Sequence, residues 1–258
     1  QMMCFSNKNS LLLMLSGMFV QYSHAIDVNV GDYTALPKGT NAGVFYYQHS
    51  QMEGYYQNGE KTRAESKSDI GIARLIHYTD IAGLRATPQI ILPFGTIRHT
   101  QIGDTDLNNA SGFADPVIAS AFWLINQPEQ GSSGRYLAFT PFIYLPVGQY
   151  DRNDAVNLGE NRFKYDLQLA WVQPLYGKFA FELYQDVIWY GDNDEAGKGD
   201  QTLSQATSYQ TQFNLRYDLN SKQRIPLGYA ANYGGEQQLD GIKLGQNMEK
   251  QQARLEFQ

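Results

Sequence analysis

The segment YQTQFNLRYDL, residues 209–219, alternates between apolar or aromatic and polar side chains along most of its length. A repeat of two residues is that of a β-strand, whose successive side chains point to opposite faces. One face of this strand is therefore apolar or aromatic, and the other is polar. A soluble β-sandwich turns such an apolar face into a packed core, whereas a membrane β-barrel turns it outward to lipid and keeps the polar face around its lumen.

The N-terminus favours export from the cytoplasm. Lys8 precedes the apolar run Leu11–Val20, and Ser23 and Ala25 place small residues three and one before a cleavage point. This layout is typical of a secretory signal peptide cleaved after Ala25. The run is too short for a helical membrane span, which needs about 20 residues. Cys4 is the only cysteine, so the mature chain has neither a disulfide nor a thiolate metal site.

The composition limits the class of partner. The chain has a formal net charge of -6, and its lysines and arginines form no recurring cluster, so nucleic acid is not an expected partner. The mean hydropathy is -0.44, although 18 tyrosines and 13 phenylalanines are present. A membrane barrel has this combination, because its polar lumen residues offset the lipid-facing ones and aromatic residues mark the interfaces.

The chain contains ten strand candidates. Most exceed the roughly 5–6 residues of a soluble strand and are long enough to cross a bilayer at a tilt, which takes about 9–11 residues. Pro88, Pro141 and Pro226 lie inside candidates, where each removes a donor from the sheet. The predicted strands are Asn41–Tyr56, Ser66–Tyr78, Gly83–Gly95, Phe113–Ile125, Arg135–Val147, Asn161–Leu175, Lys178–Tyr190, Thr207–Leu219, Gln223–Gly235 and Asn247–Gln258.

The connections between these candidates alternate in length. The segments after the odd-numbered strands are long, as in QYDRNDAVNLGE and GDNDEAGKGDQTLS, and those after the even-numbered strands are shorter, as in TDIA, YG and NSK. Long outer loops and tight periplasmic turns are typical of outer-membrane barrels. We therefore predict an all-β, antiparallel, up-and-down transmembrane barrel over residues 41–258. It follows a signal peptide, residues 1–25, and a periplasmic N-terminal segment, residues 26–40.

Several motifs also resemble a known family, in order and spacing. They are YTALPKGTNAGVFYYQH, SDIGIARLIHY, FADPVIASAFWLI, FIYLPVGQYD, NLGENRF and GYAANYGGE, and with them the resemblance covers most of the chain after Tyr33. They are similar to the outer-membrane family named for the meta-pathway of phenol degradation. The resemblance implies a barrel of about 12 strands, often described as a transporter, with no agreed catalytic residues. Because the sequence ends at LEFQ inside the tenth strand, we expect the C-terminal strands to be missing from this chain.

The polar parity of the later strands supplies the candidate site. The predicted lumen-lining residues are Lys164, Asp166, Glu182, Tyr184, Asp186, Arg216, Asp218, Arg224 and Arg254. They could guide small solutes through a pore, or they could fill and brace the interior with ion pairs. In strands four and five both parities are apolar, which indicates either an apolar binding patch or contact with an N-terminal segment that plugs the barrel.

Catalytic and metal sites have weaker support. A barrel hydrolase needs a histidine held against a carboxylate or a serine, and His49, His77 and His99 show no ligand spacing. The loop DRNDAVNLGEN contains oxygen ligands suited to calcium, but aspartate, asparagine and glycine are also common in tight loops. We predict no catalytic residue, no metal and no cofactor.

The sequence thus predicts an outer-membrane channel or transporter for passive uptake of small, hydrophobic or aromatic compounds. The alternatives are a closed structural or surface-binding barrel without transport and, less favoured, a barrel hydrolase. The expected location is the cell outer membrane. The expected partners are outer-membrane lipid and lipopolysaccharide, a small-molecule solute, and the barrel assembly machinery during insertion.

Overall fold

The structure is a computed structural model that describes residues 28–57, 60–197, 199–220, 223–245 and 248–255. The predicted signal peptide lies outside the described residues. None of the described residues forms a helix long and apolar enough to cross a membrane.

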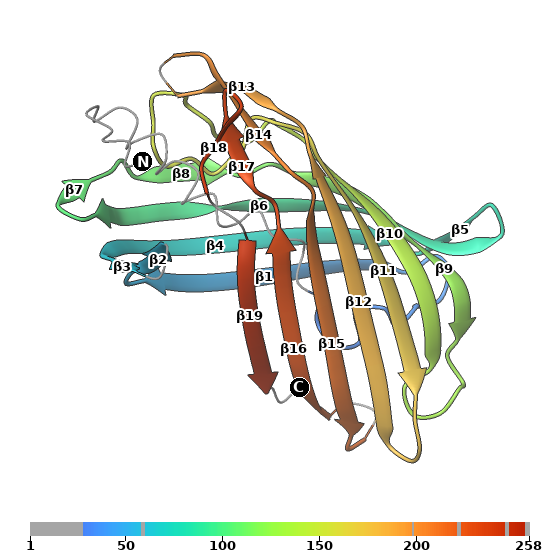
Figure 1. Cartoon of the computed structure of the whole chain (residues 1–258). Helices are drawn as coiled ribbons and strands as arrows, with labels where there is room; N and C mark the ends of the chain where they lie inside the picture. The colour runs from blue at the N-terminus through green and yellow to red at the C-terminus, as the bar shows by residue number, and fades with distance from the viewer. Residues whose placement is uncertain (1–27, 58–59, 198, 221–222, 246–247, 256–258) are drawn as a thin grey trace.

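Ten long antiparallel strands form one curved sheet in which sequence neighbours pair (Figure 1). Each corresponds to one of the ten predicted strands, so the predicted up-and-down all-β fold is confirmed. The strands, in their order across the sheet, are β1 (Asn41–Met52), β4 (Ala64–His77), β6 (Leu84–Ile102), β9 (Val117–Gln127), β10 (Arg135–Tyr144), β11 (Lys164–Pro174), β12 (Phe179–Tyr190), β15 (Ser208–Asp218), β16 (Arg224–Gly234) and β19 (Met248–Leu255).

The long connections lie together at the upper left of Figure 1, and the short turns lie at the lower right. Shorter strands form in the long connections and, in one case, in a short turn. A four-stranded sheet and a two-stranded hairpin form in the long connections, and three further strands pair with β6. These elements are β13 (Asn193–Ala196), β14 (Gln201–Gln205), β17 (Gln237–Leu239) and β18 (Ile242–Lys243) in the sheet, β2 (Tyr55–Gln57) and β3 (Glu60–Thr62) in the hairpin, and β5 (Thr79–Ile81), β7 (Thr105–Asp106) and β8 (Ala110–Phe113) beside β6.

The burial of alternate residues shows which solvent lies on each side of the sheet. On β11, Lys164, Asp166 and Gln168 are 1–3% exposed, whereas Leu167 and Leu169 are 42% and 45% exposed. The polar parity is thus buried and the apolar parity is exposed, and β12 and β15 follow the same rule. A soluble sandwich has the opposite arrangement. The wall of a membrane barrel has this one, because its outer face meets lipid.

Three prolines within the strands lie where the pairing on one side changes or is interrupted. Pro88 stands where the partner of β6 changes from β4 to β5, and Pro93 where it changes from β8 to β9. Pro141 lies where the pairing of β10 with β9 is interrupted. A residue without an N–H is tolerated at such positions, because fewer sheet hydrogen bonds are needed there.

Two predicted boundaries were wrong for a physical reason. The third strand was predicted to end at Gly95, but β6 continues to Ile102 because β4 continues to pair with it. A Cβ at residue 95 would lie 2.1 Å from the backbone oxygen of Asp69, so this glycine permits close approach of β4 and does not end the strand. The fourth strand was predicted to begin at Phe113, but β9 begins at Val117 after a break.

Candidate functional site

The chain before β1 lies inside the curved sheet. Val28 and Tyr33 are 7% and 6% exposed and belong to a core cluster with inward-facing residues of β9, β10, β11 and β12. The segment is fixed at its end by two backbone hydrogen bonds, from Gly39 to the oxygen of Tyr78 at 2.7 Å and from Tyr78 to the oxygen of Thr40 at 2.8 Å. Residues 28–40, hereafter the lumen segment, therefore fill part of the interior.

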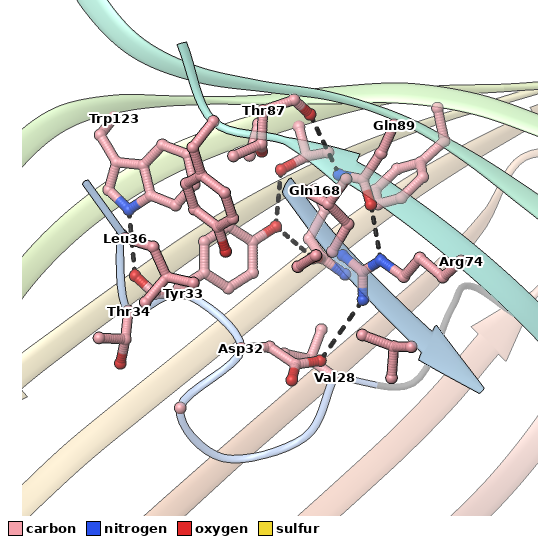
Figure 2. Close-up of a pocket in the computed structure, with 18 of the residues that line it drawn as sticks. Val28, Asp32, Tyr33, Thr34, Leu36, Arg74, Thr87, Gln89, Trp123 and Gln168 are labelled. Atoms are coloured by element: carbon pink, nitrogen blue, oxygen red, sulfur yellow. Dashed lines mark hydrogen bonds and ion pairs between the residues drawn. The ribbon is translucent and has the colours of Figure 1, made fainter. Parts of the chain in front are cut away.

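Tyr33 anchors the lumen segment to four strands, β9 to β12 (Figure 2). Its hydroxyl oxygen lies 2.6 Å from Thr140 Oγ1 of β10 and 2.6 Å from Gln168 Oε1 of β11. Its backbone oxygen accepts a 3.0 Å hydrogen bond from the indole Nε1 of Trp123 on β9. Its ring stacks on Tyr184, with centroids 5.8 Å apart. The two alternatives for strands four and five thus meet at Trp123, which contacts the N-terminal segment and also lines a cavity.

Gly31 of the lumen segment lies against a charged cluster near the short-turn end. Its N–H bonds the carboxylate of Glu182, which also contacts the guanidinium of Arg216 and accepts the hydroxyl of Tyr184. A Cβ at residue 31 would collide with the guanidinium of Arg224, and the φ of Gly31 is +88°. Only glycine suits this position, because both the backbone conformation and the space exclude a side chain.

The same cluster extends toward the turn between β9 and β10. Arg216 Nε lies 3.0 Å from Asp218 Oδ1, and Ser132 Oγ donates to Asp218 Oδ2 at 3.0 Å. Glu182 is fully buried and Arg216 is 3% exposed, so their ion pair has little access to solvent. Charges at this depth require partners, and here each finds one.

A second contact of the lumen segment involves Arg74 on β4 (Figure 2). Arg74 Nε donates to Gln89 Oε1 at 2.7 Å, and its Nη1 lies 3.7 Å from Asp32 Oδ2. Asp32 also accepts the backbone N–H of Asn29 at 3.2 Å. Burial raises the pKa of Asp32, although the charge of Arg74 acts in the opposite direction.

A cavity of about 260 Å³ lies between the lumen segment and the inner wall (Figure 2). Aromatic rings and aliphatic side chains form most of its lining, and a few polar groups point into it. The aromatic members are Tyr33, Tyr46, Tyr78, Trp123 and Phe142, and the polar members include Asp32, Arg74, Thr87, Gln89, Thr140 and Gln168.

A third polar cluster lies toward the long-connection end. Glu160 Oε1 is 2.8 Å from Lys164 Nζ, and Glu160 Oε2 is 2.7 Å from Arg162 Nη2. Burial would raise the pKa of Glu160, but the charges of Lys164 and Arg162 outweigh it and lower the pKa to about 2. Lys164 also stands 4.2 Å over the ring of Tyr144, and Arg162 stands 4.8 Å over that of Tyr190.

The connection between β10 and β11, residues 145–163, is held inward by side chains from an earlier loop. Asp115 accepts the N–H groups of Gly148 and Glu160 at 2.8 and 2.7 Å. Asn108 Oδ1 accepts the N–H of Val156 at 3.0 Å, and Val156 is fully buried. This connection contributes Glu160 to the third cluster, so the loop is part of the interior structure.

The same connection was considered as a calcium loop. In the structure Asp151 Oδ1 accepts the backbone N–H of Asn153 at 2.8 Å and its Nδ2 at 2.9 Å. Asn157 bonds the backbone at three points of the loop. These side chains serve the turns of the loop itself. Across the part of the chain that the structure describes, no group of three or more His, Cys, Asp or Glu side chains is arranged to hold a metal ion.

The structure divides the predicted lumen-lining residues among these clusters. Glu182, Tyr184, Arg216, Asp218 and Arg224 lie around Gly31, and Lys164 lies in the Glu160 cluster. Asp166 and Asp186 lie between them, both buried, with Gln168 Nε2 donating to Asp186 Oδ1 at 2.7 Å. Arg254 is opposite Gly228 in the register of β16 and β19, and its side chain lies outside the described residues.

The sequence reasoning missed Tyr33, Arg74, Glu160 and Arg162. One signal was available for Arg74, because it shares its parity on β4 with Ile70, Ile72 and Ile76. A single arginine in an isoleucine row is unusual for either face of a barrel wall. Arg162 lay in the predicted strand Asn161–Leu175 at the parity of Lys164, so the alternation offered a signal for it as well. Tyr33 and Glu160 belong to connecting segments without a period, so no pattern placed them in the interior.

The histidines do not enter the interior clusters. His49 Nδ1 lies 2.7 Å from Asp69 Oδ1, but the His49 side chain is 51% exposed on the outward parity of β1. His77 Nδ1 lies 2.7 Å from Asn41 Oδ1, also at an exposed position. His99 has a φ of +52° beside a bulge region of β6.

An antiparallel up-and-down sheet with an exposed apolar parity, a buried polar parity and a chain segment within its interior defines an outer-membrane β-barrel. This arrangement, together with the similarity to known proteins, confirms the predicted fold class and the predicted location in the outer membrane.

The model of the family described as "Putative MetA-pathway of phenol degradation" matches residues 31–257. The chain belongs to this family, as the sequence motifs predicted. Among solved structures, an outer membrane channel from Pseudomonas putida F1 is similar to it, with 36% sequence identity and a TM-score of 0.81. The similarity covers 89% of this chain and 85% of that chain. A search of the curated proteins finds no match.

Proposed function

We propose that the protein is a passive outer-membrane channel for small, hydrophobic or aromatic compounds, without cofactor or energy coupling. The observation that carries this proposal is the 260 Å³ cavity inside the barrel, walled by aromatic rings and a few polar groups. The similar structure from Pseudomonas putida F1, which is described as an outer membrane channel, supports the same function.

The route would run from the long-connection end, past the Glu160 cluster, into the cavity and then past the lumen segment. Tyr33 lies across the route that leads out of the cavity, because it contacts the inner faces of β9, β10 and β11 together. Passage along the lumen therefore depends on movement of the lumen segment. Apart from the two backbone hydrogen bonds at its end, this segment is held by contacts that involve side chains and not by the strand pairing of the sheet. Diffusion of a solute down its concentration gradient along this route requires neither a cofactor nor energy coupling.

One observation favours the alternative of a closed structural barrel. The buried contacts of Glu182, Arg216 and Asp218 join the adjacent strands β12 and β15, and the bond from Gly31 to Glu182 ties the lumen segment to them. A rigid set of mutually neutralised charges does not form the one-sided ring expected of an ion-selective pore.

Solute flux separates the two functions. We expect liposomes that contain the full-length protein to swell in small aromatic solutes such as phenol, and we expect faster swelling after deletion of residues 28–36. Folding of both proteins is checked by heat-modifiable mobility in SDS gels. If neither folded protein passes any small solute, the closed barrel is the correct interpretation.

We propose no catalytic role for this barrel, and we propose lipopolysaccharide as its outer-leaflet neighbour. Asp69 on the outward face contacts Tyr47, His49 and Arg98 at 2.5–2.7 Å. Polar side chains on a lipid-facing wall belong at the level of the headgroups.

We also propose that the barrel assembly machinery inserts the chain, as for other barrels of this class.

A further inference from the structure

We propose that the cavity beside the lumen segment binds a small aromatic carboxylate, whose carboxylate takes the place of Asp32 at Arg74. This inference rests on the proposed channel function, because a solute must reach the cavity through the barrel. It adds the chemical class of the solute and the residue that recognises it.

The guanidinium of Arg74 is prepared for a carboxylate. Arg74 Nε donates a 2.7 Å hydrogen bond to Gln89 Oε1, which fixes the plane of the guanidinium, and Arg74 Nη1 faces Asp32. Of the described residues that line the cavity, Arg74 is the one cation and Asp32 is the one anion. A carboxylate that enters the cavity therefore has a single electrostatic partner there.

The pairing of Arg74 with Asp32 is incomplete. Their closest atoms are 3.7 Å apart, whereas a charge-assisted hydrogen bond between such groups is about 2.7–2.9 Å long. An arginine can hold a carboxylate with two parallel hydrogen bonds, and this bidentate pair is not formed here. The carboxylate of Asp32 is thus near Arg74 but too far away for a charge-assisted hydrogen bond.

Burial also disfavours the ionised form of Asp32, as its raised pKa shows. Asp32 is carried by the lumen segment, which is not a strand of the sheet, so it can withdraw without breaking the strand pairing. Exchange of Asp32 for a solute carboxylate keeps one negative charge beside Arg74. The exchange therefore avoids an uncompensated buried arginine.

The rest of the cavity fits a single ring. Trp123 and Phe142 are 4% exposed and form apolar walls, and Tyr46 and Tyr78 add two further aromatic side chains. Aromatic rings pack favourably in such walls in offset or edge-to-face geometry. A cavity of about 150 Å³ is enough for benzene, so 260 Å³ accommodates one ring with a carboxylate attached.

A neutral phenol lacks the feature that Arg74 recognises. It would leave the contact of Arg74 with Asp32 in place and gain only the aromatic packing and one neutral hydrogen bond. Specificity between benzoate and phenol is thus the distinguishing property of this site.

The test is calorimetric titration of the full-length, detergent-solubilised protein with benzoate, phenol and cyclohexanecarboxylate. We expect benzoate to bind most tightly. We expect Arg74→Gln to weaken benzoate by about tenfold or more and to leave phenol unchanged, because a hydrogen bond to a charged group is lost. Asp32→Asn removes the competing carboxylate and should strengthen benzoate. Arg98→Gln is the matched control, since Arg98 pairs with Asp69 on the outward face.

Equal affinity for benzoate and phenol, or benzoate binding that Arg74→Gln does not change, would overturn the inference. If Arg74→Gln does not fold, Arg74→Lys keeps the charge without the planar fork and should give intermediate affinity. The gain in Asp32→Asn is an independent readout. Arg74-dependent binding without solute flux would refute the channel function and support the carboxylate site. Flux without Arg74-dependent binding would support the channel function and refute the carboxylate site.

Discussion

The hydroxyl of Tyr33 donates a 2.6 Å hydrogen bond to Gln168 Oε1, although 135 residues separate them in the chain. In a sheet whose neighbouring strands are also neighbours in sequence, such contacts are made by the lumen segment and not by the strands. Tyr33 thereby fixes residues that precede β1 against β10 and β11. A segment held in this way occludes the interior without being part of its wall.

The first prediction concerns that occlusion. Tyr33→Ala removes two hydrogen bonds and the ring that stacks on Tyr184, so we expect a larger single-channel conductance than that of the wild type. Tyr33→Phe keeps the ring and should change conductance less, at a loss of about 0.5–1.5 kcal/mol per hydrogen bond. Tyr176→Ala is the control, because Tyr176 is 96% exposed in a short turn. Equal conductance of Tyr33→Ala and wild type would contradict the assignment of Tyr33 as a plug residue.

The second prediction concerns the buried charges. Glu182→Met leaves Arg216 without its main buried partner, so we expect the free energy of unfolding to fall by about 3–5 kcal/mol. The double variant with Arg216→Met removes both charges and should be more stable than the single variant. Urea titration in lipid vesicles measures both. If the double variant loses the sum of the two single losses, the ion pair does not couple these residues.

Strands such as β11, β12 and β15 could be predicted because their apolar and polar side chains alternate with a period of two residues. In β11, Tyr165, Leu167 and Leu169 oppose Lys164 and Asp166, and a pattern of this kind specifies both the secondary structure and its two environments. Strand ends were less certain. Gly95 resembles a strand end in sequence, and only the approach of β4 explains its place inside β6.

The interior could be predicted only in part. The polar parity indicated Glu182 and Arg224, but Gly31, which lies against both, belongs to a segment with no period. Whether that segment enters the barrel depends on contacts over long sequence separations, such as that of Trp123 with Tyr33. Local patterns carry no information on such contacts, so the two alternatives of a plug and an apolar patch could not be separated from the sequence.

The third prediction tests the lipid-facing wall. Leu169 is 45% exposed in the middle of β11, so Leu169→Arg should lower the free energy of unfolding by about 2–4 kcal/mol. Tyr209 lies near the long-connection end of β15, so Tyr209→Arg should lower the free energy of unfolding by only about 0–1 kcal/mol. Refolding into vesicles at increasing urea gives both values. Equal losses at the two depths would argue against a membrane-embedded outer face.

The last prediction follows from the low pKa of Glu160. Its pKa is about 2 in the folded state against 4.5 ordinarily, because Lys164 and Arg162 outweigh the effect of burial. A lowered pKa stabilises the folded state above pH 4.5, and this contribution is lost as the pH falls from 4.5 toward 2. Its size at pH 7 is on the order of 3 kcal/mol.

Glu160→Gln should therefore destabilise the protein at pH 7 and should differ little from the wild type near pH 2. The same urea titration at several pH values measures the difference. Glu65→Gln is the matched control, because Glu65 pairs with Arg63 at a site where both side chains are at least 50% exposed. Such an exposed pair contributes about 0–1 kcal/mol. A Glu160→Gln loss that is independent of pH would mean that the carboxylate acts through packing and not through its charge.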